Sequence, residues 1–560
     1  MKRAWPLIAA LTTFAVTIGT LFEICLRRDA GHFVYVLDDS YIEMAIAKSL
    51  ALRAVWGVTS HGFTSASSTF LWPVLLALVD RVWKPSELTP LVLSCLAAAL
   101  AITATYIIAR RLRLPRMGIF ALLLAIIFLS PLPALVFTGM EHCLQIATAL
   151  PFVYLAAEDL TQAEGLGTRG MSCLWLLTPV LTLIRYEGLF LVFPVCVLQM
   201  LRGRRWKSVG MGLIALAPAV LYGAYSLLKG WFWLPNPIYL KGNIPRLIRA
   251  RGTVPGIYGA FTWSAKTADL LSVGLALVVL FGLLAYHYRT LWRTSTTMIF
   301  IVVFAGALHL KFAGLGWFFR YEAYLVALAL LALSAGLKDY LSQCQRKDDI
   351  SLLERSAATL LMAYCMLVPT TILCLRGYQA ITHIPQASQN VFDQQYQMGL
   401  FLRRFYPDAS VAVNDIGAVA YLDNPHLLDL WGLASLSVAK IESKAPITPT
   451  EIERLATSKK VVVAIVYKRL FKNGVIGRGG LPKQWTQVGK WTLVNNYMSA
   501  DSTVSFFATR PSGVAPLVAH LRQFSNSLPR AVVQSGKYIK KIHRDSNQSG
   551  LTQTEQPKHI

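Results

Sequence analysis

Charged residues are scarce in this chain. Only 15% of its 560 residues are Asp, Glu, Lys or Arg, whereas 55% are hydrophobic, and the mean hydropathy is +0.48. A soluble protein of this size could not hide so much apolar surface from water. The composition therefore excludes a soluble globular protein and indicates a membrane protein.

Acidic residues and paired cysteines are also lacking. The 29 Asp and Glu residues are outnumbered by 54 Lys and Arg, which gives a formal charge of +25. In a soluble protein this excess would suggest a nucleic-acid partner, but here much of it lies in short loops beside apolar runs, so membrane topology explains it better. The eight cysteines include no C-x-x-C spacing, and seven lie inside apolar runs. They are typical of core residues and not of a metal site.

The first apolar run, Trp5 to Leu26, has no small-x-small cleavage site, so we interpret it as an uncleaved anchor. It and ten further runs approach or exceed the about 20 apolar residues that cross about 30 Å of hydrocarbon. The expected spans lie near 6–27, 88–109, 117–137, 141–157, 171–184, 187–201, 209–228, 267–286, 295–313, 321–338 and 355–375.

The run 69–83 is doubtful, because it is short, contains Pro73 and ends with Asp80 and Arg81. If it is an interfacial or re-entrant helix, the basic loops fall on the cytoplasmic side, as the positive-inside rule expects. These loops are 110–116, 202–207, 288–293 and 345–349. We therefore predict about 11 transmembrane helices in the cytoplasmic (inner) membrane, a cytoplasmic N-terminus and an extracytoplasmic C-terminal domain.

The composition changes at about residue 376 to short strand-like runs at 409–422, 460–467 and 491–497, separated by turn residues. We interpret this part as an extracytoplasmic α/β domain. The last stretch is polar and rich in Lys, Gln and Ser, which predicts disorder. The expected divisions are a transmembrane catalytic module over 1–375, its first outer loop with interfacial helices over 28–87, the α/β domain over 376–530 and a disordered tail over 531–560.

Two adjacent acids, Asp38 and Asp39, follow the first apolar run by about ten residues. One interpretation is helix capping, since Ser40 and Glu43 form an S-x-x-E capping box and acids suit the positive end of a helix dipole. Capping explains why a helix starts here, but not why two aspartates lie at the outer surface. There, an amphipathic helix lying flat on the bilayer would hold them at the membrane face.

Further polar residues fall in short connections on the same outer side, and ionisable groups near spans are costly unless they are paired or functional. These residues are Glu141, Arg185, Glu187, Asn236, Lys241, Arg320, Tyr321 and Glu322. Four of them, Arg185, Glu187, Arg320 and Glu322, could brace the bundle by mutual ion pairing. Alternatively, they line a cavity that holds an anionic amphiphile and performs general base chemistry.

One basic segment, 239–252, breaks the positive-inside pattern with Lys241, Arg246, Arg249 and Arg251. Longer loops can escape the rule, which is one explanation. The other is an anionic ligand, such as a phosphate at the membrane surface.

Taken in order, these motifs resemble those of the GT-C glycosyltransferases, polytopic enzymes that use lipid-phosphate sugars. The resemblance covers roughly residues 5–435 and rests on "DDSYIEMAIAKSL", "WGVTSHGFTSASSTFLWPVLLAL", "TGME", "RYEG", "LPNPIYLK" and "FRYEAYL". The segment 413–433, "VNDIGAVAYLDNPHLLDLWGL", is similar to one in arabinofuranosyltransferase-like enzymes of bacteria and mycobacteria, and the group also includes protein-mannosyltransferase-like enzymes. The resemblance implies an α-helical polytopic GT-C module plus an outer α/β domain, acting in cell-envelope biogenesis.

The resemblance also implies a reaction. An inverting enzyme would move a hexose or pentose from a polyprenyl-phosphate donor to a hydroxyl of a glycan, lipid or protein acceptor outside the membrane. Asp38 or Asp39 would act as the base. Lys241 and Arg320 would stabilise the charge that builds on the phosphate, and Arg246 and Asn236 would help to bind the donor.

Supporting or donor-orienting roles fall by resemblance to Glu141, Arg185, Glu187, Tyr321 and Glu322. Some enzymes of this fold use a divalent ion and others use none. Asp38 and Asp39 could bind such an ion through their oxygens, so metal dependence stays open.

Two other classes of function compete with this one. A flippase or transporter for lipid-linked sugars would use the charges as a translocation path, but transporters place their sites near the midplane, often within paired repeats. The sequence has no repeat halves, and its charges cluster on one side. A non-catalytic scaffold would leave the acid pair and the outer basic segment without a role, so the sequence favours a glycosyltransferase.

Overall fold

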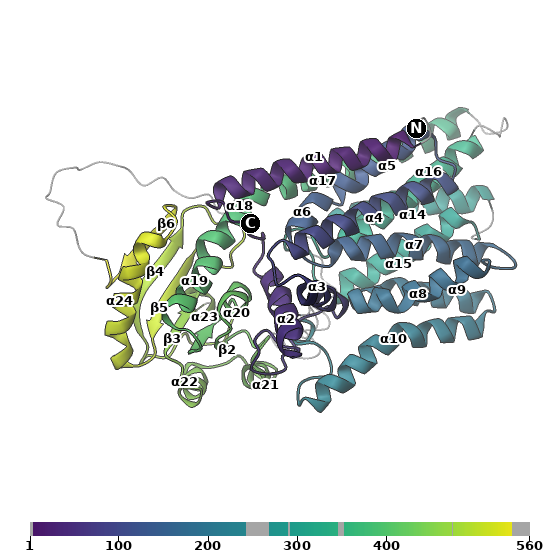
Figure 1. Cartoon of the computed structure of the whole chain (residues 1–560). Coiled ribbons are helices and arrows are strands. Elements are labelled where there is room, and N and C mark those ends of the chain that lie inside the picture. The colour runs from purple at the N-terminus through teal and green to yellow at the C-terminus, as the bar shows by residue number, and fades with distance from the viewer. Residues whose placement is uncertain (1–3, 242–267, 289–291, 345–351, 473, 540–560) are drawn as a thin grey trace, which may run out of the picture.

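The computed structural model describes residues 4–241, 268–288, 292–344, 352–472 and 474–539. A bundle of long helices and an α/β domain are stacked end to end, with the N-terminus at the end of the bundle far from the α/β domain (Figure 1). The bundle is formed by α1 (Trp5–Arg28), α4 (Thr89–Arg111), α5 (Arg116–Leu129), α6 (Leu132–Phe137), α7 (His142–Thr161), α8 (Thr168–Ile184), α9 (Gly188–Leu201), α10 (Arg205–Leu228), α14 (Ala268–Tyr288), α15 (Thr294–Phe312), α16 (Ala323–Cys344) and α17 (Leu352–Thr382).

Each expected span coincides with a helix of this bundle. Within the described residues, seven helices are long and apolar enough to cross a membrane, and three shorter apolar helices accompany them. The protein is therefore a multi-pass helical membrane protein. Length and composition alone support fewer spans than the expected eleven, because α8, α9 and the described apolar part of α14 are each shorter than 18 residues and α17 is described only in part.

Two short helices lie between the bundle and the α/β domain: α2 (Asp39–Arg53) and α3 (Leu71–Val82) (Figure 1). With 12 residues, α3 is about 18 Å long, which is too short to cross the hydrocarbon core. The run 69–83 is thus not a span, as the charge pattern predicted.

The expected capping box of α2 is not formed. Asp38 is the N-cap residue and makes no side-chain capping bond, while the Ser40 hydroxyl donates to the backbone oxygen of Thr138. The Glu43 carboxyl instead contacts Ser67. Most of α2 is buried, so the prediction of an amphipathic helix lying flat is wrong: α2 packs against other elements on more than one side.

The C-terminal domain contains one six-stranded mixed sheet in the order β2-β1-β3-β5-β4-β6, in which β2, β1 and β3 are parallel and the other pairings are antiparallel. Its strands are β1 (Ser410–Val413), β2 (His426–Asp429), β3 (Val463–Val466), β4 (Thr486–Leu493), β5 (Thr503–Ala508) and β6 (Val532–Gly536). The other helices are α11 (Asn236–Lys241), α18 (Ile384–Val391), α19 (Gln397–Phe405), α20 (Gly417–Asp423), α21 (Leu436–Glu442), α22 (Pro449–Ser458), α23 (Lys468–Lys472) and α24 (Val514–Phe524).

The predicted α/β domain is confirmed, with corrections to its details. The run 409–422 holds a strand and then a helix, β1 and α20, because Asn414–Ile416 turns the chain between them. Strand β6 lies inside the segment 531–560 that was expected to be disordered, since it pairs with β4 and completes the sheet. Residues 540–560 lie outside the described residues.

Hydrogen bonds join the α/β domain to the first outer loop and to α11. Lys48 Nζ donates to the backbone oxygen of Tyr421 at 2.7 Å, and the Ser60 amide donates to Asn424 Oδ1 at 2.7 Å. These bonds hold the domain against α2, at the end of the bundle that faces the domain.

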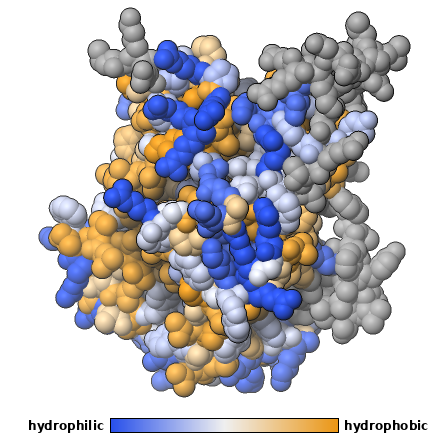
Figure 2. Space-filling model, turned by 90° about the vertical axis from the view of Figure 1, so that its right-hand side faces the viewer, coloured by the Kyte–Doolittle hydropathy of each residue, from blue (hydrophilic) through white to orange (hydrophobic). Residues whose placement is uncertain are grey.

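Hydrophilic side chains gather on the opposite end of the bundle, which Figure 2 views directly. At this end, Arg204 pairs with the buried Asp159 at 3.0 Å, and Arg202 donates to the backbone oxygen of Leu160. The basic loop at 202–207 therefore lies at the end of α7 that faces away from the α/β domain.

Candidate active site

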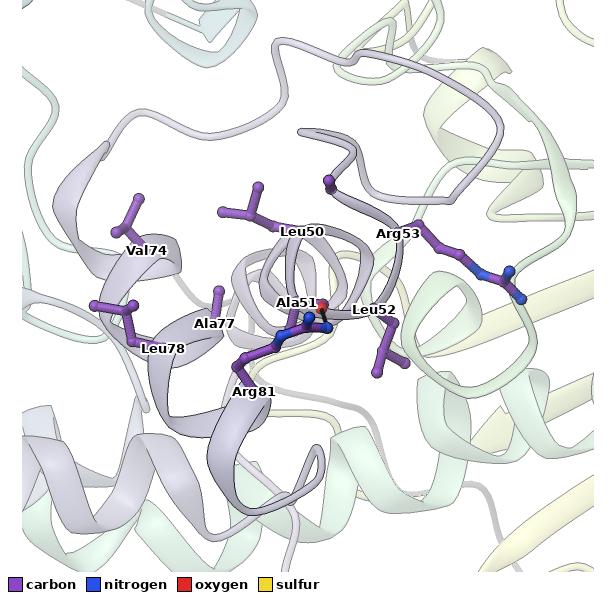
Figure 3. A pocket seen from close by; sticks show the side chains of 9 residues that line it. Leu50, Ala51, Leu52, Arg53, Val74, Ala77, Leu78 and Arg81 are labelled. Atoms are coloured by element: carbon purple, nitrogen blue, oxygen red, sulfur yellow. Dashed lines mark hydrogen bonds between the residues drawn. The ribbon is translucent and has the colours of Figure 1, made fainter.

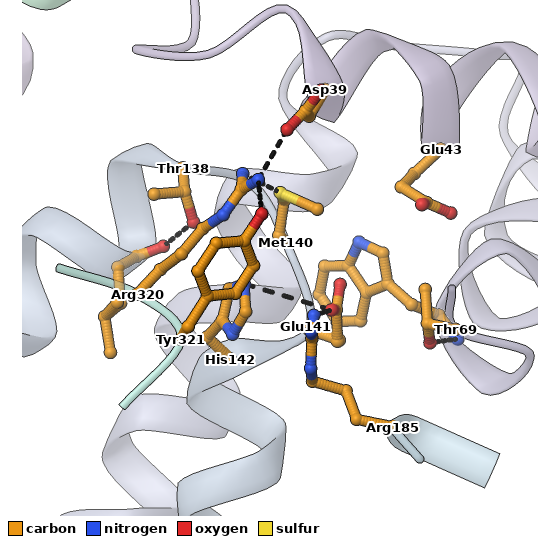
Figure 4. A network of polar contacts seen from close by, with 12 residues as sticks. Asp39, Glu43, Thr69, Thr138, Met140, Glu141, His142, Arg185, Arg320 and Tyr321 are labelled. Atoms are coloured by element: carbon orange, nitrogen blue, oxygen red, sulfur yellow. Dashed lines mark hydrogen bonds and ion pairs between the residues drawn. The ribbon is translucent and has the colours of Figure 1, made fainter. Parts of the chain in front are cut away.

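A buried polar network lies where four segments meet: the start of α2, the connection before α7, the α8–α9 turn and the loop before α16 (Figure 4). The α8–α9 turn is only three residues long, Arg185–Glu187. Gly188 permits it, because a Cβ atom there would come within 2.6 Å of the Leu181 backbone. The turn places its charged side chains at the outer ends of the bundle.

Arg320 is a central residue of the network, and its side chain is only 2% exposed. Its Nη2 forms an ion pair with Asp39 Oδ2 and donates to the Tyr321 hydroxyl at 3.0 Å. Although burial lowers it, the pKa of Arg320 is raised above its ordinary value by Tyr321 and Asp39. The guanidinium therefore stays charged.

The backbone before Arg320 is unusual. Three consecutive residues, Trp317, Phe318 and Phe319, have φ values of 48°, 64° and 58°, in the left-handed region that non-glycine residues seldom adopt. Such conformations persist where the surroundings enforce them, often at functional sites. This stretch aims Arg320 back into the bundle.

Arg185 forms the second ion-paired centre. Its Nη1 donates to Glu141 Oε1 at 2.6 Å, and its Nε and Nη2 bind the two oxygens of Glu187 at 3.1 and 2.8 Å. Burial raises the pKa of Glu187, but Arg185 outweighs burial and holds that pKa below its ordinary value. The bidentate geometry fixes the guanidinium plane.

Tyr321 joins the two centres. The guanidinium carbons of Arg320 and Arg185 lie 4.8 and 5.5 Å from the centroid of its ring, within the range of cation–π attraction. Glu322, in contrast, points to a different partner, Arg376, at 2.8 Å, and accepts a bond from the Gly316 amide at 3.0 Å. It braces the loop and lies outside the two centres, and the sequence did not single out Arg376.

The acid pair is divided between two environments. Both oxygens of Asp38 accept bonds from backbone amides at the start of α20, those of Gly417 and Ala418, each at 2.8 Å. Burial and the nearby Asp415 raise the pKa of Asp38 to about 8. Asp39 instead faces Arg320, and 31% of its side chain is exposed. Asp39 therefore belongs to the polar network, whereas Asp38 belongs to the domain interface.

The predicted donor-binding residues are only partly placed. Asn236 is buried, and its Nδ2 donates to the backbone oxygens of Gly432 and Leu433 at 2.7 and 3.2 Å, so it ties α11 to the α/β domain. Lys241 ends α11, but its side chain and all of Arg246 lie outside the described residues.

Sequence reasoning missed Glu43 as a residue of this site. It follows Asp39 by four residues, one helical turn, so both side chains lie on the same side of α2. That spacing is the signal that could have identified it. Ser67, which contacts Glu43, belongs to a serine-rich run that the sequence marked only as polar.

The two carboxylates of the acid pair have different partners. Asp38 is bound by amides, and Asp39 is paired with Arg320. In the part of the chain that the structure describes, no three His, Cys, Asp or Glu side chains are grouped to hold a metal ion.

Two cavities lie along α3. The larger, of about 550 Å³, is formed by α2 and α3, and Arg81 Nη1 donates to the Ala51 backbone oxygen at its edge at 3.1 Å (Figure 3). The smaller, of about 350 Å³, is almost wholly apolar and opens between α3, the end of α8 and α10. Its lining residues are Trp56, Phe70, Leu71, Val74, Leu183, Pro218, Leu221, Tyr222 and Tyr225.

The fold is similar to that of ArnT from Cupriavidus metallidurans. The crystal structure of ArnT bound to undecaprenyl phosphate matches with a TM-score of 0.52 and 12% identity, covering 91% of this chain and 99% of ArnT. Its apo structure matches with a TM-score of 0.52 and 11% identity, covering 90% of this chain and 99% of ArnT. The likeness, together with the bundle and the α/β domain, confirms the predicted GT-C-type fold.

Sequence comparison adds little. A family model described as "Domain of unknown function (DUF8728)" matches residues 389–507, which lie in the α/β domain and the helices that precede its first strand. No curated protein matches the chain.

Proposed function

We propose that this protein is a glycosyltransferase that moves a sugar from a polyprenyl-phosphate donor to an acceptor hydroxyl at the outer face of the cytoplasmic membrane. The observation that carries the proposal is the Asp39–Arg320 pair, which sets a carboxylate beside a buried cation at the outer ends of the bundle helices. The ArnT-like fold supports it, since one ArnT crystal structure contains undecaprenyl phosphate.

Asp39 is the better candidate for the base. A base must be ionised and must reach the acceptor hydroxyl. Asp39 is partly exposed and lies beside a cation, whereas both oxygens of Asp38 are engaged by α20. Asp38 then acts as a positioning residue, because its bonds to α20 fix the backbone next to Asp39.

The reaction is a single inverting displacement. The acceptor oxygen attacks the anomeric carbon and loses its proton to Asp39, while the bond between that carbon and the phosphate oxygen breaks and its electron pair leaves with polyprenyl phosphate. Arg320 would stabilise the charge that develops on the phosphate, as a fixed cation in a site that largely excludes water. By resemblance, Lys241 and Arg246 would assist it.

The remaining groups keep this geometry. Glu141 and Glu187 fix Arg185, and Tyr321 lies between the two guanidinium groups. The apolar cavity between α3 and α10 fits the first isoprene units of the donor, because its lining is apolar and its Tyr222 bonds to Ser65 in the first outer loop at 2.8 Å. The acceptor is a hydroxyl of a glycan, lipid or protein, presented beneath the α/β domain.

The proposal is tested by measuring transfer from radiolabelled polyprenyl-phosphate sugars by purified protein in nanodiscs. Asp39→Asn should lower turnover by about 100-fold or more, the usual contribution of a general base. Glu23→Gln is the matched control, since it removes an exposed carboxylate on α1. Undiminished turnover in Asp39→Asn would remove this residue from the chemistry. Donor movement across liposomes without any transfer would favour a transporter.

A further inference from the structure

Glu43 is a buried carboxyl group without a cation. Only 3% of its surface is exposed, and no Lys, Arg or His of the described residues lies within ion-pairing distance. The three other carboxylates of the network, those of Asp39, Glu141 and Glu187, each pair with an arginine. Burying an unpaired carboxylate is so costly that such groups take up a proton instead.

The hydrogen bonds around Glu43 can also accommodate an extra proton. Ser67 Oγ lies 2.9 and 2.8 Å from the two oxygens of Glu43 and 2.8 Å from the Thr69 backbone oxygen, and it accepts a bond from the Thr69 amide at 3.1 Å. The serine hydroxyl has one hydrogen for these acceptors. If Ser67 donates to the Thr69 oxygen, a protonated Glu43 can donate to Ser67 from one of its two oxygens.

The charged and titratable groups that face Glu43 act in both directions. Asp39 on its own helix and Glu141 before α7 oppose its ionisation, whereas Arg185 after α8 favours it, and the Tyr222 hydroxyl of α10 is neutral. Burial is the largest influence and Glu141 the next, and together they raise the pKa of Glu43 well above its ordinary value.

We infer that Glu43 is held as a neutral carboxylic acid and is a positioning residue for an anionic, phosphate-linked ligand. It ties α2 to the loop of Ser67 and Thr69, and by remaining uncharged it leaves the two arginines able to attract a phosphate. That the ligand is a polyprenyl phosphate rests on the proposed function.

The charges of the network explain why a neutral Glu43 favours the binding of a phosphate. The network holds two guanidinium groups, of Arg185 and Arg320, against three paired carboxylates. A fourth carboxylate would add a second excess negative charge near the phosphate, and like charges at such distances repel strongly in a low-dielectric site. Ionised Glu43 should therefore weaken ligand binding.

The test compares wild type with Glu43→Gln, a neutral group of the same shape, by titrating nanodisc-held protein with undecaprenyl phosphate from about pH 6 to about pH 9. The phosphate's own titration affects both proteins equally, so the ratio of their dissociation constants isolates Glu43. We expect the two proteins to bind with equal affinity at acidic and neutral pH, because both then carry a neutral group at position 43. A dissociation constant at least about threefold lower for Glu43→Gln at neutral pH would mean that Glu43 is ionised there. In transfer assays, KM for the donor should follow the same ratio.

A second measurement does not depend on the proposed function. An infrared difference spectrum of wild type minus Glu43→Gln at neutral pH should contain the carbonyl band of a protonated carboxylic acid, and Ser67→Ala should shift that band. A carboxylate band in its place, or tighter binding of undecaprenyl phosphate by Glu43→Gln at neutral pH, would overturn the inference. If wild type binds no undecaprenyl phosphate but the acid band is present, the proposed donor fails while the neutral state of Glu43 stands.

Discussion

Asp39 and Arg320 form an ion pair although 281 residues separate them in the chain. Asp39 opens α2, and Arg320 lies in the loop before α16. Their contact joins the first outer loop to one of the last outer connections of the bundle. The site therefore exists only when the bundle is fully assembled.

Substitutions of the two aspartates should have different effects: Asp38→Asn should mainly lower stability, and Asp39→Asn should mainly lower turnover. Asp38→Asn places an NH₂ group against one of two backbone amides at the start of α20, so it should destabilise the protein by about 1–3 kcal/mol. Turnover at low temperature should fall less than about tenfold, unlike in Asp39→Asn. Thermal melting and transfer assays on both variants measure the difference, and an Asp38→Asn protein that is stable but inactive would contradict our assignment.

Arg185 should be essential for folding. Arg185→Leu leaves Glu141 and Glu187 buried without a cation, which should cost about 3–5 kcal/mol. Arg27→Leu breaks the exposed pair with Glu23 on α1 and should change stability by less than about 1 kcal/mol. Denaturation midpoints in detergent compare the two variants. Equal midpoints would mean that the Arg185 pairs contribute no more than an exposed pair.

Asp29 should make stability depend on pH. Burial and the neighbouring Asp393 raise the pKa of this carboxyl from 3.8 to about 7, although Ser388 donates to it at 2.6 Å. The fold thus favours the protonated form, and its contribution is complete below the unfolded pKa and is lost as pH rises from about 4 to about 7.

Asp29→Asn cannot ionise, so its stability should fall less over that range. The difference from wild type should be on the order of 1 kcal/mol per pH unit. Melting temperatures across the range measure it, and curves that run parallel for the two proteins would show that Asp29 does not titrate there.

The apolar cavity should recognise the length of the donor's lipid. Leu221 lines it, and Leu221→Trp should fill part of its volume, raising KM about tenfold for a long polyprenyl donor but not for a short isoprenyl analogue. Leu228→Trp is the control, because Leu228 lies on the same helix outside the lining residues and is 85% exposed. Equal effects of Leu221→Trp on both donors would place the lipid chain elsewhere.

The bundle was predictable because apolar runs of membrane length leave few alternatives to a helix. The break between α8 and α9 was also readable, since Arg185 and Glu187 interrupt two short apolar runs. These features depend only on neighbours in the sequence.

The division of the acid pair was not predictable, because it depends on partners hundreds of residues away. Adjacent residues at a helix start point in different directions, and only the folded chain shows that Asp38 meets Gly417 while Asp39 meets Arg320. The same is true of Glu322 and Arg376, which pair across two helices. The capping box failed for a related reason: Ser40 and Glu43 are buried, and tertiary partners replaced the local bond.

Gly417 approaches the bundle so closely that a Cβ atom there would lie 2.0 Å from the Asp38 backbone oxygen. The α/β domain thus rests, through α20, directly on the residue that precedes Asp39. The backbones of Gly417 and Asp38 touch with no side chain between them, so a tilt of the α/β domain should also move the first turn of α2. An acceptor that shifts the α/β domain as it binds would then also move Asp39, the proposed base.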